Sequence, residues 1–334
     1  MQLFAEITES VGTKLGFVAE RARREKAAVF NGIMHHVNEE SLKASFQQLR
    51  KECAVGVDGI SWEEYESKLE ENIKGLMERI RKMSYRPQAV RRVYTPKENG
   101  TQRPIGIPAM EDKMVQKAMS WVMEAIYEQD FHEDSYGFRG GKSCHQALKR
   151  IDELIMSKPI NHIIEADIKG FFDNVGHDKL MQMLGIRIRD EYFRRYVVRF
   201  LKSGYMEADA FKKTEKGTPQ GGNISPMLAN VFLHYVVDEW FEKEIKPRMR
   251  GQGYVVRYCD DFVILVQYKD EAGMILKELK ERLECNGLTT NDEKTKVVSF
   301  GRYEKENARW ERRKANTFDF LGITHYIGLS RRIP

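Results

Sequence analysis

Apolar residues along the chain form short runs that fit strands and longer stretches with helical spacing. Three runs rich in β-branched and aromatic residues predict strands at 163–168, 254–256 and 262–266. Apolar residues at helical spacing and helix-start signals predict helices at 61–83, 111–128, 142–157, 225 to about 243, and 269–286. Residues 90–108 predict a strand hairpin, because Asn99-Gly100 is a strong turn signal.

Two adjacent acids, Asp260 and Asp261, lie between the strands predicted at 254–256 and 262–266. Only a tight hairpin joins strands that are so close in sequence, and we expect its tip to carry both acids. Adjacent carboxylates beside an apolar core repel each other unless a cation neutralises them. The pattern therefore indicates a divalent metal site, with a solvated acidic turn as the alternative.

A third acid, Asp167, lies near the end of the strand predicted at 163–168. Together with the hairpin pair it would form a three-carboxylate cluster, which suits two Mg²⁺ ions, with Mn²⁺ as a substitute. Two such ions can stabilise the attacking and leaving oxygens of a displacement at phosphorus. Asp173 has a simpler explanation as a helix N-cap.

Seven ordered blocks between about residues 50 and 326 resemble the blocks of reverse transcriptases. In order they read QRPIGIP at 102–108, SYGFR at 135–139, DIKGFFD at 167–173, GTPQGGNISP at 217–226, DD at 260–261, GLTTNDEKTK at 287–296 and FLG at 320–322. The fourth block, the LAN that follows it and GVDGI at 56–60 are similar to bacterial group II intron-encoded and group II-like enzymes. Cys259 stands where these enzymes most often carry Ala, and both side chains are small.

The resemblance implies an α+β fold with the fingers and palm of a right-hand polymerase and an antiparallel palm sheet backed by helices. We expect an N-terminal extension at 1–50, fingers at 51–160 and a palm at 161–334, with part of the fingers inserted around 185–225. The chain stops at Pro334, soon after the last block. We therefore expect no helical thumb, and short products as a result.

The resemblance also implies roles for individual residues. Metal ions would be held by the carboxylates of Asp167, Asp260 and Asp261 and by the backbone carbonyl of Ile168. Contacts to the incoming nucleotide are expected from Lys97, Arg103, Phe172 and Gln220. Contacts to nucleic acid are expected from Arg139, Gly221, Gly222, Lys294, Leu321 and Gly322.

Some of these roles have alternatives. Lys97 and Arg103 would neutralise the triphosphate, or they are ordinary hairpin charges. Phe172 lies where the family places the bulky side chain that excludes a ribose 2′-hydroxyl, and the alternative is a core Phe. Either Lys294 or Lys296 would protonate pyrophosphate, and their spacing does not choose between them.

Charge is unevenly distributed along the 334 residues, whose formal net charge is +5. Residues 74–103 contain nine Lys and Arg but two acids, which suits a phosphate track or, alternatively, a solvated helix face with a charged hairpin. The four cysteines have no CxxC spacing, which argues against a zinc site or a disulfide framework. Without a signal peptide or an apolar run of membrane length, we expect a soluble, cytoplasmic protein and no membrane partner.

The function implied is an RNA-directed DNA polymerase, the reverse transcriptase of a retroelement, with RNA template, DNA primer and dNTPs as partners. Group II intron RNA is a further expected partner, because the family often also acts in intron splicing as a maturase. The alternative is an RNA-binding maturase in which synthesis is secondary. The three intact carboxylates favour catalysis, whereas the oligomeric state, including a homo-oligomer, stays open.

Overall fold

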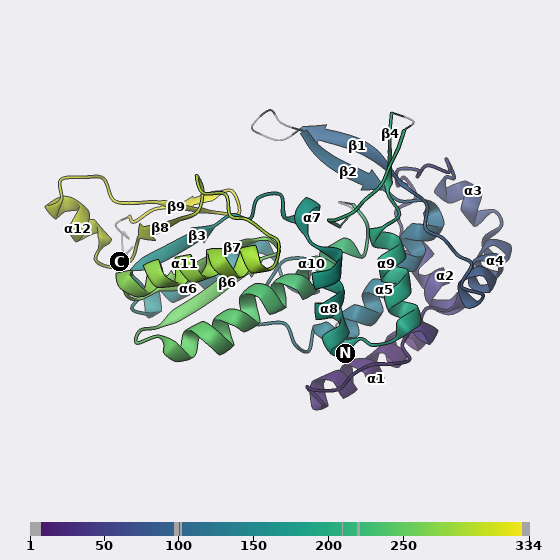
Figure 1. The fold of residues 1–334 in the computed structure, drawn as a ribbon, viewed down its shortest axis with the longest axis horizontal. Coiled ribbons are helices and arrows are strands. Elements are labelled where there is room, and N and C mark those ends of the chain that lie inside the picture. Colours follow the sequence, from purple (N-terminus) through teal and green to yellow (C-terminus); the bar gives the residue numbers. More distant parts are fainter. Residues whose placement is uncertain (1–7, 97–99, 101, 209, 219–220, 329–334) are drawn as a thin grey trace, which may run out of the picture. The chain divides into compact units, whose positions relative to one another are not determined.

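The computed structural model describes residues 8–328, except 97–99, 101, 209 and 219–220 (Figure 1). The chain divides into two compact units. Unit 1 comprises Met1–Asp130 and Phe172–Val231, and unit 2 comprises Phe131–Phe171 and Phe232–Pro334. Mixed α and β content with antiparallel sheets agrees with the predicted fold class.

Unit 1 combines helices with a four-stranded sheet of order β2-β1-β4-β5. Its helices include α1 (Glu9–Arg24), α2 (Glu39–Gln47), α3 (Trp62–Glu66), α4 (Leu69–Arg81), α5 (Met110–Tyr127), α8 (His177–Arg187) and α9 (Glu191–Leu201). Its strands are β1 (Val90–Pro96), β2 (Gln102–Ile107), β4 (Tyr205–Glu207) and β5 (Ala210–Lys212). Helix α5 is buried on almost every side, because α1 and α2 both pack on it. The predicted hairpin at 90–108 is confirmed as the antiparallel pair β1 and β2.

The single helix predicted over 61–83 is wrong, because the chain breaks between α3 and α4. Ser61 does cap α3, where its side chain accepts from the Glu64 backbone N–H in a capping box. The break lets Trp62 pack on Phe46 of α2, with ring centroids 4.8 Å apart. This packing outweighs the continuous apolar periodicity from which one helix was expected.

Unit 2 is built on the antiparallel sheet β6-β7-β3-β8. The strands are β3 (His162–Ala166), β6 (Gly253–Tyr258), β7 (Asp261–Val266) and β8 (Lys296–Ser299), followed by the hairpin β9 (Phe318–Phe320) and β10 (Ile323–His325). The strand predictions at 163–168, 254–256 and 262–266 are therefore confirmed, with boundaries shifted by one to two residues. Helix α6 (Cys144–Ser157) packs on β6, and α11 (Lys269–Cys285) packs on β3, β7 and β8.

Both faces of the unit 2 sheet are buried. Ile163, Val256, Leu265 and Val298 share a core with α6 and β9. Alternate residues such as Ile164 and Ile264, which are also buried, point to the opposite face. Burial on two faces explains why these strands read as continuous apolar runs rather than as an alternating pattern.

The remaining helical elements belong to both units. They are α7 (Phe171–Asn174), α10 (Ser225–Leu233), α12 (Glu304–Trp310) and the short turns at Met34–His36, His234–Asp238, Phe241–Ile245 and Lys246–Arg248. Helix α10 continues through wide π-type turns, so the helix predicted from 225 to about 243 is confirmed. In the part of the chain that the structure describes, no helix has the length and apolar character needed to cross a membrane.

Candidate active site

The turn between β6 and β7 is a two-residue hairpin. Tyr258 pairs with Asp261 across the strands, which leaves Cys259 and Asp260 as the turn. Cys259 has a φ of 58°, a left-handed conformation that two-residue hairpins require. Asp260 thus lies at the tip as predicted, whereas Asp261 is the first residue of β7. The prediction that the tip carries both acids is wrong in this detail.

Asp167 directly follows β3, the antiparallel neighbour of β7. The last registered pair of the two strands is Ala166 with Phe262, so Asp167 and Asp261 end adjacent strands at the same edge. Both acids line one cavity of about 300 Å³. The Asp167 carbonyl accepts from the Asn291 backbone N–H at 2.8 Å, which fixes the end of the strand. The sheet therefore brings together acids that lie 94 positions apart in sequence.

The carboxyl of Asp261 carries a clear electrostatic signature. Although the residue keeps exposed surface, partial burial of its carboxyl raises the pKa to about 6, and the charges of Asp260 and Asp167 add to that rise. The Leu321 backbone N–H donates to the Asp261 carboxylate at 3.2 Å and lowers the pKa, as does Lys294. Three mutually repelling carboxylates offer the hard oxygen ligands that Mg²⁺ prefers.

These carboxylates fit a divalent metal by their chemistry and their closeness, but they do not form a complete coordination shell. Among the described residues, no group of three or more His, Cys, Asp and Glu side chains is already positioned to hold an ion. A divalent cation held by these carboxylates would offset their mutual repulsion. The backbone of Ile168 lies at the same strand end, where it forms an antiparallel bridge with Thr290.

The two lysines that the sequence did not distinguish have different surroundings. Lys294 is exposed and lines the cavity beside Asp167 and Asp261. Lys296 lines the same cavity, but its ammonium lies 3.1 Å from the Glu165 carboxylate in an ion pair. Lys294 is therefore the less constrained of the two.

Sequence reasoning missed Arg257, which supports the turn between β6 and β7. Its side chain is fully buried and forms two hydrogen bonds to the Asp238 carboxylate, at 2.8 and 2.6 Å. The same guanidinium donates to the Cys259 carbonyl at 3.0 Å. The available signal was a charged residue inside the apolar run of β6, because such a charge needs a buried partner.

The loop with the SYGFR block packs directly against the turn. A Cβ atom added to Gly137 would lie 2.4 Å from the Cys259 backbone nitrogen, so only glycine fits there. Arg139 donates to the carbonyls of His132 and Ser135, at 2.7 and 2.6 Å, and thereby braces the loop. Its contact with nucleic acid stays a prediction.

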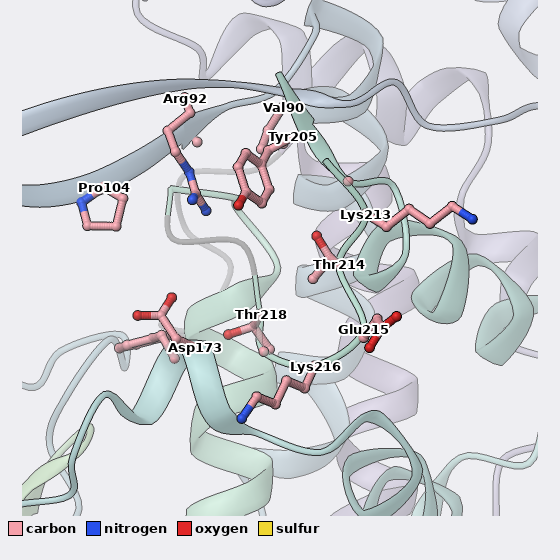
Figure 2. A pocket seen from close by; sticks show the side chains of 14 residues that line it. Val90, Arg92, Pro104, Asp173, Tyr205, Lys213, Thr214, Glu215, Lys216 and Thr218 are labelled. Atoms are coloured by element: carbon pink, nitrogen blue, oxygen red, sulfur yellow. The ribbon is translucent and has the colours of Figure 1, made fainter. Parts of the chain in front are cut away.

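Unit 1 contains a separate cavity of about 660 Å³ (Figure 2). Phe172 and Asp173 line it. Asp173 lies across the cavity from Arg92 in Figure 2, and the Arg92 guanidinium carbon lies 3.4 Å from the centre of the Tyr205 ring. The Phe172 carbonyl accepts from the Thr218 backbone N–H at 2.7 Å, which joins two of the blocks. The prediction that Asp173 is an N-cap is wrong, because Asp173 lies within α7.

The other predicted nucleotide and nucleic-acid residues of unit 1 are only partly described. Lys97 and Gln220 lie outside the described residues, whereas Arg103 is exposed on β2. A Cβ atom on Gly221 would lie 2.4 Å from the Gly106 carbonyl, so β2 itself explains this glycine. The carbonyl of Gly222, which is buried, accepts from the Ser225 backbone N–H at 3.2 Å.

The basic residues of 74–103 do not form one continuous track. Arg79 of α4 pairs with Glu111, and Lys82, which directly follows α4, pairs with Glu78. Among the described residues, neither Lys74 nor Arg86 has an ion-pair partner. For the basic residues on and next to α4, the alternative of a solvated helix face is therefore partly correct.

Comparison with known proteins identifies the family. The family model described as "Reverse transcriptase (RNA-dependent DNA polymerase)" matches residues 95–325. The chain is 31% identical over 295 residues to "Group II intron-encoded protein LtrA" of Lactococcus lactis subsp. cremoris, which covers 82% of this chain and 49% of LtrA. It is 34% identical over 272 residues to "Protein YkfC" of Escherichia coli (strain K12), covering 72% of this chain and 71% of YkfC.

A more distant similarity extends to plants. "Nuclear intron maturase 3, mitochondrial" of Arabidopsis thaliana is 22% identical over 203 residues, covering 53% of this chain and 28% of the relative. The chain spans about half the length of LtrA. The chain belongs to the reverse transcriptase family, and the predicted resemblance to its group II intron-encoded members is confirmed.

Proposed function

We propose that the chain is an RNA-directed DNA polymerase of the group II intron type, which copies RNA into cDNA from a DNA primer and dNTPs. The placement of Asp167 and Asp261 at the ends of adjacent strands, with Asp260 in the neighbouring turn, carries the proposal. Membership of the family and the similarity to LtrA support it. A cytoplasmic location is part of the same proposal.

In this proposal the unit 2 sheet is the palm, and the β1–β2 hairpin of unit 1 belongs to the fingers. The antiparallel sheet backed by α6 and α11 supports the first assignment. The QRPIGIP block lies on β2, which supports the second. The exposed Arg103, with Lys97, would neutralise the triphosphate, since Arg suits bidentate phosphate contact.

Two Mg²⁺ ions, or Mn²⁺ in their place, would be held by Asp167, Asp260 and Asp261 with the Ile168 carbonyl. When bound, such ions lower the pKa of the primer 3′-hydroxyl and neutralise charge on the triphosphate. The Leu321 N–H orients Asp261, and Gly322 allows the adjacent hairpin turn, with a φ of 74°.

Other residues would handle the nucleotide itself. Lys294 is the favoured proton donor to pyrophosphate, because Lys296 is engaged by Glu165. Gln220, with Gly221 and Gly222, would lie beside the nascent base pair. Arg139 would contact the template while it braces its loop.

Binding of intron RNA in a maturase role is the second candidate function. The names of LtrA and of the Arabidopsis relative, which refer to a group II intron and an intron maturase, favour it. The two functions need different residues, since synthesis uses the carboxylates and intron binding uses basic surface.

Primer extension on an RNA template tests the proposal. The wild-type chain, with Mg²⁺ and dNTPs, should extend the primer, and EDTA or Asp260→Asn should abolish extension. Asp260→Asn should still bind group II intron RNA. Extension that persists in Asp260→Asn would refute the metal assignment. If the wild-type chain binds intron RNA but extends no primer, the maturase role is the function that remains.

A further inference from the structure

One surface of unit 2 presents large aromatic side chains and cations together, far from the carboxylates. We define the α12 surface by a set of exposed side chains, which are Arg302, Tyr303, Lys305, Glu306, Arg309, Trp310, Arg312 and Lys314. Trp310 is 90% exposed and Tyr303 is 54% exposed. A tryptophan that an ordered helix leaves in water is unusual, because its ring carries a large apolar area.

Helix α12 packs on unit 2 through one buried face, so the exposure of Trp310 does not come from a poorly packed segment. Glu304 and Ala308, one turn apart, are buried at 2% and 3% exposure. The Glu304 carboxylate pairs with Arg313 and accepts from the Asn316 backbone N–H at 2.9 Å. Because Glu304 and Ala308 face inward, residues two positions away, Glu306 and Trp310, must face outward.

Charge on this surface is strongly positive once the internal pairs are removed. Residues 301–315 contain six Lys and Arg and three Glu. Arg313 pairs with both Glu304 and Glu311, which leaves five cations against Glu306 alone. Among the described residues, none of these five cations has an ion-pair partner. A surface that presents both cations without ion-pair partners and exposed aromatic rings suits phosphates and stacked bases.

The geometry also separates this surface from the site of synthesis. On β8, Lys296 pairs with Glu165 near the carboxylates, whereas Ser299 pairs with His162 at the opposite end of β3. The chain continues from Ser299 into α12, which lies beyond that far end of the sheet (Figure 1). A cavity of about 420 Å³ beside Glu306, Arg309 and Trp310 offers space next to the ring.

We propose that the α12 surface is a second RNA-binding site, which stacks an unpaired base on Trp310 and contacts the adjoining phosphates through Arg309 and Arg312. The proposal rests on the proposed function, because an enzyme of this class already handles RNA. Single-stranded RNA is the favoured partner because a stacked base must be unpaired. The site would hold RNA outside the template track, such as a loop of structured RNA.

The test measures binding of a fluorescein-labelled oligo(A) RNA of about 12 nucleotides. The chain is first saturated with unlabelled RNA template annealed to DNA primer, so that the track beside the carboxylates is filled. Trp310→Ala should weaken oligo(A) binding about thirtyfold, the middle of the range for one stacked base. Trp310→Phe should largely restore binding, and Phe17→Ala should not weaken it, although Phe17 is an aromatic 68% exposed on α1.

Salt dependence and synthesis provide independent readouts. Replacing Arg309 and Arg312 by Gln should lower the slope of log affinity against log salt by about 0.7 per residue. Primer extension at saturating template should be the same in every variant as in the wild type. If the wild type itself extends no primer, that result counts against the proposed function and not against the α12 surface. Unchanged oligo(A) affinity and salt slope in Trp310→Ala would overturn the proposal. So would a wild-type dimer that Trp310→Ala converts to monomers, because the surface would then bind a second copy.

Discussion

At the scale of single residues, Asp261 combines a proposed catalytic role with a cost to stability. Its folded-state pKa is raised to about 6 by burial of the carboxyl and by the neighbouring acids. In the unfolded chain the pKa of the same group is near its ordinary value of 3.8. The folded protein therefore binds this proton more tightly than the unfolded chain, and stability falls as the pH rises from about 4 to 6.

Asp261→Asn should consequently stabilise the metal-free protein while abolishing primer extension. Above pH 6 we expect a gain of about 1 kcal/mol in the free energy of unfolding, reduced by solvent screening of the exposed residue. The gain should vanish below about pH 4, where Asp261 is protonated in both states. Denaturant unfolding in EDTA across this pH range measures it.

Asp292→Asn is the matched control for this pH dependence. Lys280 lowers the pKa of the exposed Asp292 carboxyl, so its stabilising contribution is present at neutral pH and is lost on acidification. Asp292→Asn should therefore not stabilise the protein at pH 7. Equal stabilisation by both variants would show that the position of Asp261 beside the other acids does not matter.

Phe172 is the residue on which sugar selection should depend. It lines the unit 1 cavity, and its carbonyl is tied to Thr218 at 2.7 Å, so the backbone beneath the ring is fixed. Phe172→Ala should raise incorporation of ribonucleotides relative to deoxyribonucleotides at least tenfold, because a steric block is removed. Competition of rNTPs with dNTPs in primer extension measures the ratio. An unchanged ratio would favour the alternative that Phe172 is a core side chain.

At the scale of elements, the β6–β7 hairpin, which carries the proposed catalytic acids, depends on its neighbours for its position. Gly137 lies so close to Cys259 that an added methyl group would meet the turn backbone at 2.4 Å. Gly137→Ala should displace the turn and lower kcat at least tenfold. Gly273→Ala on α11 is the control, because nothing lies within 4 Å of its added Cβ. That variant should keep full activity and gain about 0.5–1 kcal/mol in stability from the better helix propensity.

The Arg257–Asp238 pair should act on the same turn by a different route. Asp238→Asn leaves a buried guanidinium without its counter-ion and should cost about 3–5 kcal/mol in stability. The double variant Arg257→Met, Asp238→Leu removes both charges and should recover much of that stability. It still lacks the hydrogen bond to the Cys259 carbonyl, so kcat should stay low while the KM for dNTP changes little. Full recovery of kcat in the double variant would assign the pair a purely structural role.

Much of unit 2 could be predicted from the sequence because its elements carry local signals. The apolar runs of β3, β6 and β7 identified the strands, and the two acids between β6 and β7 identified the hairpin. Interactions between distant positions were not predictable in this way. The donation from Leu321 to Asp261 joins residues 60 positions apart and involves a backbone N–H, which leaves no trace in composition or spacing. The break between α3 and α4 likewise follows from packing on Phe46, which the local periodicity does not contain.

At the scale of the whole molecule, the net charge of +5 says less about RNA affinity than the pairing of individual charges. Only cations without an acidic partner are available to release counterions from a nucleic acid. Arg79 of α4 and Lys82 directly after it are already paired with Glu111 and Glu78. Lys74 and Arg86, in the same basic tract, have no ion-pair partner in the described part of the chain.

Two pairs of substitutions with the same effect on net charge should therefore differ in their effect on binding. Lys74→Gln with Arg86→Gln should lower the slope of log RNA affinity against log salt by about 0.7 per residue. Arg79→Gln with Lys82→Gln should change that slope little, because each of these cations is already paired with an acid and is not available to a phosphate. Titration of a single-stranded RNA at several salt concentrations measures both slopes. Equal changes in the two variants would mean that net charge, rather than the positions of unpaired cations, determines how this protein holds RNA.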